Sequence, residues 1–257
     1  MSLMAKQIYC FLFSLVIIGG PAFSAKAETT TVSVASNFIT TAEKLVVMFE
    51  EQFDHKVKLA SGSSGKIVTQ ILHGAPFDLF LAADFSHPIK LIENGMARRE
   101  DLFTYAVGRL ALFSSQIDKE LEQGTAPLSS SNIKRIAVAN PRLAPYGQAA
   151  FEYMQATNVL AATKDKLVYG NNVAQTYQFI ATGNANIGFV ALSQVLNVQK
   201  GSYWLVPQKY HAPLKQAAIL TLKGTRNQAA RDFYAFLKSE VARALIRQQG
   251  YDISEEG

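Results

Sequence analysis

The segment Gly62-Ser63-Ser64-Gly65-Lys66 has residue types and spacing that could do chemistry. It joins residues 57–60, which predict a strand, to an amphipathic run that predicts a helix. The first N–H groups of a helix lack partners inside it and lie at the positive end of the helix dipole, so such a turn attracts oxyanions. Two serine hydroxyls add donors, and the two glycines permit positive φ and close approach of a ligand to the backbone. The simpler alternative is that one serine only caps the helix.

Two kinds of enzyme use a similar turn, and the spacing agrees poorly with both. A P-loop requires glycine where this chain has Ala60, and Ser or Thr where it has Ile67. Ser63 and Lys66 match the Ser-x-x-Lys spacing of penicillin-binding enzymes, but the companion SDN and KTG motifs are absent. A serine hydrolase therefore stays open only as a weak alternative to an anion-binding turn.

A second turn of the same kind lies upstream, at Ser36 and Asn37. It follows the predicted strand 31–35 and precedes a helix whose apolar residues have helical spacing. Two consecutive βα units therefore end in small polar residues. In open α/β sheets the carboxyl ends of the strands meet at one edge, where ligands bind.

The second half of the chain repeats this arrangement. Residues 135–140 predict a strand that leads into the loop 141–148, which contains Pro145-Tyr146-Gly147. Residues 166–169 predict another strand, followed by Gly170-Asn171-Asn172-Val173 at the start of a helix. The sequence thus predicts four donor-rich strand-to-helix turns.

The titratable residues do not form an enzyme centre. The four histidines are isolated, none forms an HxxxH pair, and each is interpreted as a surface or helix-end residue: His55, His73, His87 and His211. Asp84 is better explained as a cap for the segment that begins at Ser86. With no base, nucleophile pair or metal cluster, we expect a binding protein that is not an enzyme and has no cofactor.

Short β-rich runs alternate with amphipathic helices, which predicts an α/β fold with mostly parallel sheets. The apolar run 103–114, interrupted by Gly108, predicts a strand passing from one lobe to the other, and 215–222 predicts the return. We therefore assign 28–106 and 212–257 to lobe 1 and 107–211 to lobe 2. A single packing helix is predicted from about 227 to 249.

Residues 1–27 predict a secretory signal peptide. Lys6 supplies positive charge, the apolar run that follows is interrupted by Gly and Pro, and Ala25-Lys26-Ala27 forms a cleavage site. Cys10, the only cysteine, leaves with this segment, so the mature chain has neither disulfides nor thiolate metal ligands. Removing the two lysines takes the formal charge from +5 to +3. This mild charge, without a basic stripe, argues against a nucleic-acid partner.

Several blocks of the sequence together resemble a known family, the periplasmic molybdate-binding proteins that serve ABC importers. The blocks are VASNF, GSSGKIVTQILHGAPFDLFLAAD, NPRLAPYGQAA, GNNVAQ and GNANIGFVALS, and they span nearly the whole mature chain. The resemblance implies a type II periplasmic-binding-protein fold, with two α/β lobes joined by two crossover strands and the ligand between them. It also implies a monomer that captures molybdate or tungstate and delivers it to the importer's membrane subunits.

In this family uncharged donors from four loops hold the oxyanion. The resemblance places the first-loop donors at Ser36 and Asn37 and the second-loop serine at Ser64, with Ser63 as the next choice. It places the third-loop contact at Tyr146 and the fourth, a backbone N–H, at Val173.

One departure from the family pattern concerns Ala191, where many members have a tyrosine. Members with the APYG sequence have the tyrosine in the third loop, so we expect Tyr146 to supply that hydroxyl. The alternative ligand is another tetrahedral oxyanion such as sulfate.

Overall fold

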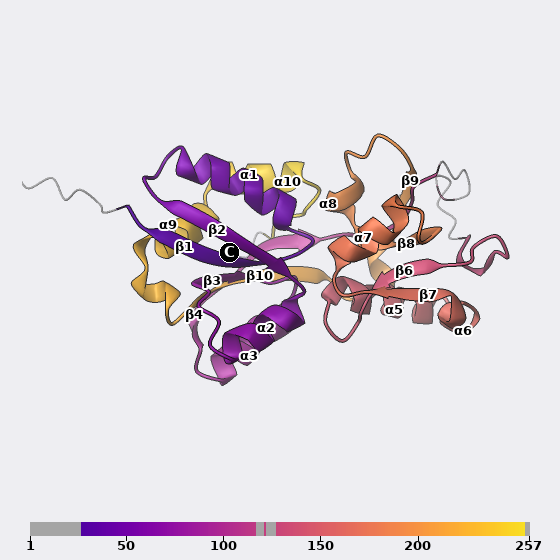
Figure 1. Cartoon of the computed structure of the whole chain (residues 1–257), viewed down its shortest axis with the longest axis horizontal. Coiled ribbons are helices and arrows are strands. Elements are labelled where there is room, and N and C mark those ends of the chain that lie inside the picture. Colours follow the sequence, from indigo (N-terminus) through magenta and orange to yellow (C-terminus); the bar gives the residue numbers. More distant parts are fainter. Residues whose placement is uncertain (1–26, 117–120, 122–126, 255–257) are drawn as a thin grey trace, which may run out of the picture.

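The computed structural model describes residues 27–116, 121 and 127–254 (Figure 1). The predicted signal peptide, apart from Ala27, lies outside the described residues. No helix in the described part is long and apolar enough to cross a membrane. The described residues form two α/β lobes that lie side by side along the longest axis of the molecule (Figure 1). We name lobe 1 and lobe 2 by their sheets; the exact residue boundaries of the lobes stay a prediction.

The sheet of lobe 1 has five strands in the order β2-β1-β3-β10-β4. β1 is parallel to β2 and β3, whereas β10 is antiparallel to β3 and β4. Because β1 and β2 are parallel neighbours, their carboxyl ends lie together, and the Ser36 N–H donates to the Gly62 carbonyl at 2.9 Å. The strands are β1 Thr29–Ala35, β2 Lys56–Gly62, β3 Leu79–Leu81, β4 Ala97–Gly108 and β10 Leu214–Thr221.

Helices cover both faces of this sheet, with α1 and α10 on one side and α2 and α3 on the other (Figure 1). The prediction of one long C-terminal helix is wrong, because the segment forms two helices, α9 and α10. The side chain of Ser239 caps the second helix by accepting a hydrogen bond from the Ala242 N–H at 3.2 Å. The helices are α1 Ile39–Glu50, α2 Ser64–Leu72, α3 Ser86–Glu93, α9 Gln228–Phe236 and α10 Glu240–Gln248.

The sheet of lobe 2 has the order β7-β6-β8-β5-β9, with β6 parallel to β7 and β8. The predicted loop 141–148 is wrong in its second half, since α5 begins at Pro145, whose fixed φ suits the first turn of a helix. The strands are β5 Leu110–Ser114, β6 Ile136–Ala139, β7 Leu167–Gly170, β8 Ile187–Ala191 and β9 Ser202–Leu205; the helices are α5 Pro145–Ala156, α6 Leu160–Thr163, α7 Val173–Ala181 and α8 Leu192–Val195. Short 3-10 helices are η1 Pro127–Ser129, η2 Lys164–Lys166, η3 Gln208–Tyr210 and η4 Gly224–Arg226.

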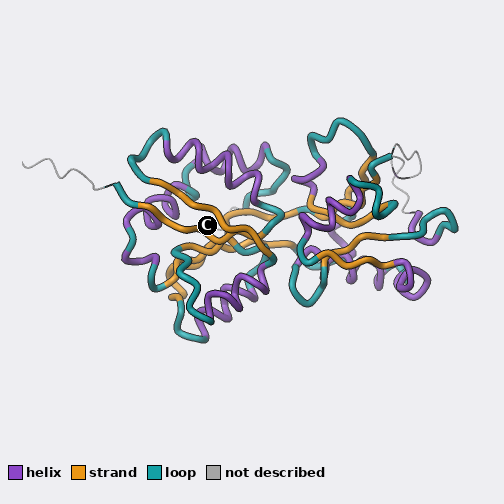
Figure 2. Tube along the Cα trace, in the orientation of Figure 1, coloured by secondary structure: helices purple, strands orange, loops and turns teal. Residues whose placement is uncertain are grey.

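Two chain segments connect the lobes, as predicted. β4 and β5 are separated only by Arg109, and residues 206–213 lead from lobe 2 back to β10. Strand segments therefore run between the two halves (Figure 2). The C-terminal segment lies against the first connection, because Val107 and Asp252 exchange backbone hydrogen bonds of 2.7 and 2.9 Å.

Each lobe has its own core, and one cluster also crosses the seam between the lobes. The core of lobe 1 contains Phe38, Phe49 and Phe233. The buried cluster of lobe 2 around Tyr146 also includes Ala35, from the end of β1 in lobe 1. The seam is therefore a packed region of the molecule.

Candidate anion-binding site

The first turn meets lobe 2 directly. Ser36 is 4% exposed, and its hydroxyl oxygen accepts a hydrogen bond of 3.4 Å from the Ala174 N–H at the start of α7. The neighbouring residue, Val173, is the first residue of that helix and is 3% exposed. Because the first N–H groups of a helix have no acceptor within it, the Val173 N–H has no partner inside α7. Two predicted site residues from different lobes are therefore next to each other.

Asn37 is held by hydrogen bonds that use both hydrogens of its side-chain amide. Its Nδ2 donates to Oε1 of Gln216 at 2.9 Å and to the hydroxyl of Tyr251 at 3.2 Å. The backbone carbonyl of Asn37 accepts from the Tyr251 hydroxyl at 2.7 Å and from the hydroxyl of Ser193 of lobe 2 at 3.2 Å. Asn37 can therefore offer a ligand its backbone N–H, while its side chain fixes the surrounding residues.

The second turn differs from a simple helix cap. Ser63 precedes α2 with extended backbone angles and makes no side-chain capping bond. Its hydroxyl is buried and has no hydrogen-bond partner in the described structure. The hydroxyl of Ser64 accepts from the Ala83 N–H at 3.1 Å and keeps its own proton for another acceptor. Both serines can donate to an anion.

The two glycines of this turn do not use the positive φ that glycine permits. Gly65 instead allows close approach of the other lobe. Its N–H donates to the Leu143 carbonyl at 3.0 Å, and an added Cβ would lie 3.2 Å from Leu143 backbone atoms and 3.3 Å from Nε2 of His87. The small residue therefore serves the contact between the lobes.

The third turn places Tyr146 in the first turn of α5, with 2% of its surface exposed. Gly147 makes this possible, because a Cβ there would collide with the backbone of Ala139 at the end of β6. The Tyr146 hydroxyl accepts a hydrogen bond of 3.1 Å from Nε2 of Gln216. Burial, and after it the nearby Tyr251, raise the pKa of Tyr146 well above its ordinary value, while the hydrogen bond from Gln216 partly opposes this shift. The phenol is therefore neutral and carries a proton that it can donate.

The fourth turn is organised by Asn172, whose side chain accepts from the Gln175 N–H at 2.9 Å. Ala191, the departure from the family pattern, ends β8 and is fully buried. Its N–H donates to Oε1 of Gln194 at 3.0 Å.

Sequence reasoning did not single out Gln216, Tyr105, Ser193 or Tyr251 as parts of this region. Gln216 was detectable in principle, because it is a polar residue directly before the apolar run 217–220 of strand β10, where it is fully buried. Tyr251 gave no such signal, since it lies beyond the last helix. Its contacts depend entirely on where the C-terminal segment returns in the fold.

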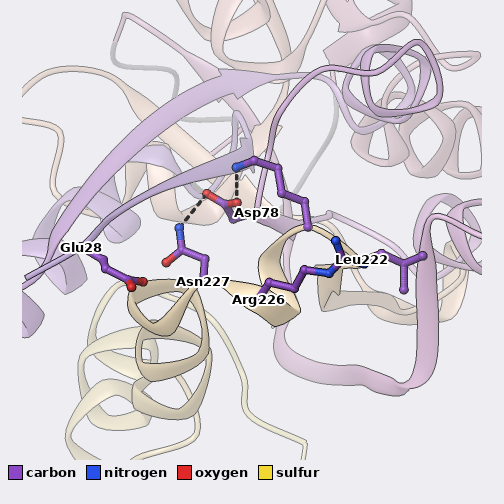
Figure 3. Close-up of a pocket in the computed structure, with 6 residues that line it drawn as sticks. Glu28, Asp78, Leu222, Arg226 and Asn227 are labelled. Carbon is purple, nitrogen blue, oxygen red and sulfur yellow. Dashed lines mark hydrogen bonds and ion pairs between the residues drawn. The ribbon is translucent and has the colours of Figure 1, made fainter. Parts of the chain in front are cut away.

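Two hollows of the surface differ in character. One lies between the lobes beside two of the predicted site residues, and the other lies within lobe 1, away from them. Ser36 and Asn37 line one side of a groove of about 400 Å³ between the lobes, bordered by α1, α7 and α8. A cavity of about 460 Å³ lies near the start of β1, at Asp78 (Figure 3). The buried Asp78 carboxylate accepts from the Thr31 N–H at 2.9 Å and pairs with Lys223 and with Asn227. Its charge is thus used to hold lobe 1 together.

The interpretation of the histidines is wrong for His55, which is buried between α1 and β2, whereas His211, although buried, does lie at a helix end, directly after η3. His55 has a structural role, with Nε2 3.1 Å from the carboxylate of Asp232. The prediction for Asp84 is confirmed, since its carboxylate accepts from the Ser86 hydroxyl at 2.8 Å and from the His87 N–H at 3.3 Å. In the described part of the chain, no group of three or more His, Cys, Asp or Glu residues could hold a metal ion.

The hydrolase alternative finds no support in the position of Lys66. Its Nζ donates to Oδ1 of Asn171 at 3.2 Å, across the seam and exposed to solvent. The Ser63 hydroxyl has no partner within the described residues, so these two side chains do not form a nucleophile–base pair.

Comparison with known proteins agrees with this picture. Residues 30–252 match the model of the family described as bacterial extracellular solute-binding protein. The molybdate-binding protein ModA of Rhodobacter capsulatus is 42% identical over 93% of this chain and 94% of its own length. ModA of Azotobacter vinelandii is 41% identical over 90% of this chain and 93% of its length. A solved periplasmic molybdate-binding protein of Azotobacter vinelandii matches with a TM-score of 0.82 and 35% identity, covering 88% of this chain and all of that chain.

These matches confirm the predicted type II periplasmic-binding-protein fold and the prediction of a binding protein in place of an enzyme. The match to the family model covers most of the chain, and the ModA relatives are well above 30% identity. This chain therefore belongs to the family of bacterial extracellular solute-binding proteins, together with the molybdate-binding ModA proteins.

Proposed function

We propose that this protein captures molybdate, and tungstate with it, and delivers the anion to the membrane subunits of an ABC importer. The observation that carries the proposal is a set of uncharged donors from both lobes at one seam, in a chain 42% identical to a molybdate-binding protein. The proposed donors are the hydroxyls of Ser36, Ser64 and Tyr146 and the N–H groups of Asn37 and Val173. Ser63 is a further candidate, because its buried hydroxyl lacks a partner among the described residues.

A set of N–H and O–H donors without a carboxylate acceptor suits a fully ionised tetrahedral dianion. Every oxygen of such an anion accepts hydrogen bonds, whereas an anion that keeps a proton also needs an acceptor in the site. Each hydrogen bond to a charged group contributes about 1.5–3 kcal/mol, so the five proposed donors, or six with Ser63, support micromolar to nanomolar affinity after the costs of ordering. No arginine is required.

Calorimetry with molybdate, tungstate, sulfate and hydrogen phosphate tests this function. Molybdate and tungstate are nearly the same size, so we expect similar affinities. Sulfate has shorter bonds, and poor geometry at two hydrogen bonds would cost about 3 kcal/mol, roughly a hundredfold in affinity. Equal affinity for sulfate and molybdate would overturn the molybdate proposal. Turnover in esterase or β-lactam assays would revive the hydrolase alternative.

We further propose that the mature protein is a periplasmic monomer, exported by cleavage near residue 27, whose lobes 28–106 with 212–257 and 107–211 close around the ligand. Direct contacts between the lobes, such as those from Gly65 to Leu143 and from Ser193 to Asn37, support a closed form. Small-angle scattering should give a monomer mass and a smaller radius of gyration when molybdate is added. An unchanged radius at saturation would contradict closure.

A further inference from the structure

Gln216 is a fully buried polar residue at the junction of the lobes. It lies on β10, just after the chain returns from lobe 2, and pairs with Ala106 of β4. The register shifts after this pair, so that Ala217 pairs with Thr104 and Tyr105 is the extra residue on β4. Such bulges redirect side chains. Here the hydroxyl of Tyr105 reaches Oε1 of Gln216 at 2.8 Å.

The hydrogen bonds of Gln216 fix which way its amide points. Oε1 accepts from Nδ2 of Asn37 at 2.9 Å as well as from Tyr105. An NH₂ group in the same place would face the Asn37 amide N–H, donor against donor. The NH₂ group of Gln216 must therefore face Tyr146, whose hydroxyl lies 3.1 Å from Nε2.

This orientation decides what the Tyr146 hydroxyl can do. A phenol has one proton and accepts through its oxygen lone pairs. The NH₂ group of Gln216 donates to the Tyr146 oxygen, and because it has no lone pair to offer it cannot accept the Tyr146 proton. We propose that Gln216 is a positioning and specificity-determining residue, which commits the Tyr146 proton to the bound anion and so selects an oxyanion with no proton of its own. This inference rests on the proposed function.

The backbone around this pair provides independent support. Gly108 ends β4, and a Cβ at this position would collide with the Tyr146 hydroxyl and with Nε2 of Gln216. The glycine at the connection between β4 and β5 therefore leaves room for the contact between the Tyr146 hydroxyl and the Gln216 amide. Within the described part of the chain, Asp84 is the charged group that contributes to the raised pKa of Tyr105, after burial and the tyrosines 251 and 146.

The first test replaces the amide by a carboxyl group. In Gln216→Glu, an ionised carboxylate accepts the Tyr146 proton and turns it away from the ligand, whereas a protonated carboxyl can donate as the amide does. We expect molybdate affinity to fall at least a hundredfold at pH 8 and to recover at least tenfold at pH 6. The parent, titrated alongside, should change by less than threefold. Gln228→Glu, which adds the same charge at the start of α9, is the control and should behave like the parent.

Charge repulsion alone could also produce such a pH profile, and Tyr146→Phe separates the two causes. In the double variant Gln216→Glu/Tyr146→Phe there is no phenol proton to redirect. We expect its recovery between pH 8 and pH 6 to be at least threefold smaller than in Gln216→Glu. Equal recoveries in the two variants would overturn the inference.

Gln216→Met provides a second test of the inference in case Gln216→Glu does not fold. Methionine has a similar length and frees the Tyr146 oxygen to accept a proton from a ligand. The ratio of hydrogen phosphate to molybdate dissociation constants should then fall at least tenfold relative to the parent. A folded variant with the parent's ratio and affinity would overturn this inference alone. A parent that binds no oxyanion of the panel would overturn the proposed function as well.

Discussion

The two sides of the candidate site are built in different ways. On one side, Ser63 and Ser64 belong to a turn of consecutive residues between β2 and α2. On the other, the Tyr146 hydroxyl is oriented by Gln216, whose partner Asn37 is 179 positions away in the sequence. The turn depends on local backbone geometry, whereas the Gln216 cluster exists only when both lobes and the crossover are in place. We therefore expect substitutions in the cluster to affect folding and binding together, whereas in the turn Ser63→Ala should affect binding alone.

The largest effect is expected for Gly108→Ala. The added Cβ would displace the Tyr146 hydroxyl and the Gln216 amide together. Overpacking should lower the free energy of unfolding by about 1–3 kcal/mol. Loss of the oriented phenol should weaken molybdate binding by at least about 3 kcal/mol, measured by calorimetry.

Gly183→Ala is the matched control for this substitution. Gly183 has a φ of 75° and nothing near its Cβ position, so alanine there strains the backbone far from the cluster. It should cost about 1 kcal/mol in stability and leave affinity unchanged. If Gly108→Ala also kept the parent's affinity, the cluster would not control binding.

Tyr146→Phe should have the next largest effect. It removes one donor to the anion, which weakens molybdate binding by about 2–3 kcal/mol. It also leaves Nε2 of Gln216 without an acceptor in a buried place, which should cost about 1–3 kcal/mol in unfolding free energy. Tyr153→Phe, on the same helix, is the control for calorimetry and denaturation. A Tyr146→Phe protein with the parent's affinity would remove Tyr146 from the site.

Comparison of Ser63→Ala with Ser64→Ala should separate effects on binding from effects on folding in the turn. Each should weaken molybdate binding by about 1.5–2 kcal/mol, because each removes a possible donor to a charged ligand. Only Ser64→Ala should lower stability, by about 1–3 kcal/mol, because it leaves the buried Ala83 N–H unpaired. Ser63 has no partner in the described structure, so its loss should leave denaturation unchanged. If both folded variants bound like the parent, the turn would not contact the anion.

The sequence was sufficient to predict those features that depend on neighbouring residues. The strand-to-helix turns at Ser36, Ser64 and Val173 follow from periodicity and small polar residues, and the crossover at Gly108 follows from an interrupted apolar run. The start of α5 was misplaced, because Pro145 suits both a loop and the first turn of a helix. The role of Gln216 was beyond reach, since it depends on a register shift between β10 and β4 and on residues from distant segments.

The smallest effect is expected for Lys66→Ala, although Lys66 is the charged residue of the turn. Its Nζ makes one solvent-exposed hydrogen bond of 3.2 Å to Asn171 of the other lobe. Removing an exposed bond of this kind should weaken binding by no more than about 1 kcal/mol. Any attraction between its charge and the anion is screened over about 8 Å at physiological ionic strength, so the difference from the parent should shrink as salt is added. Titrations of molybdate at low and high salt measure both quantities. A loss as large as that of Tyr146→Phe, unchanged by salt, would mean that a cation holds the anion and that uncharged donors alone do not account for the site.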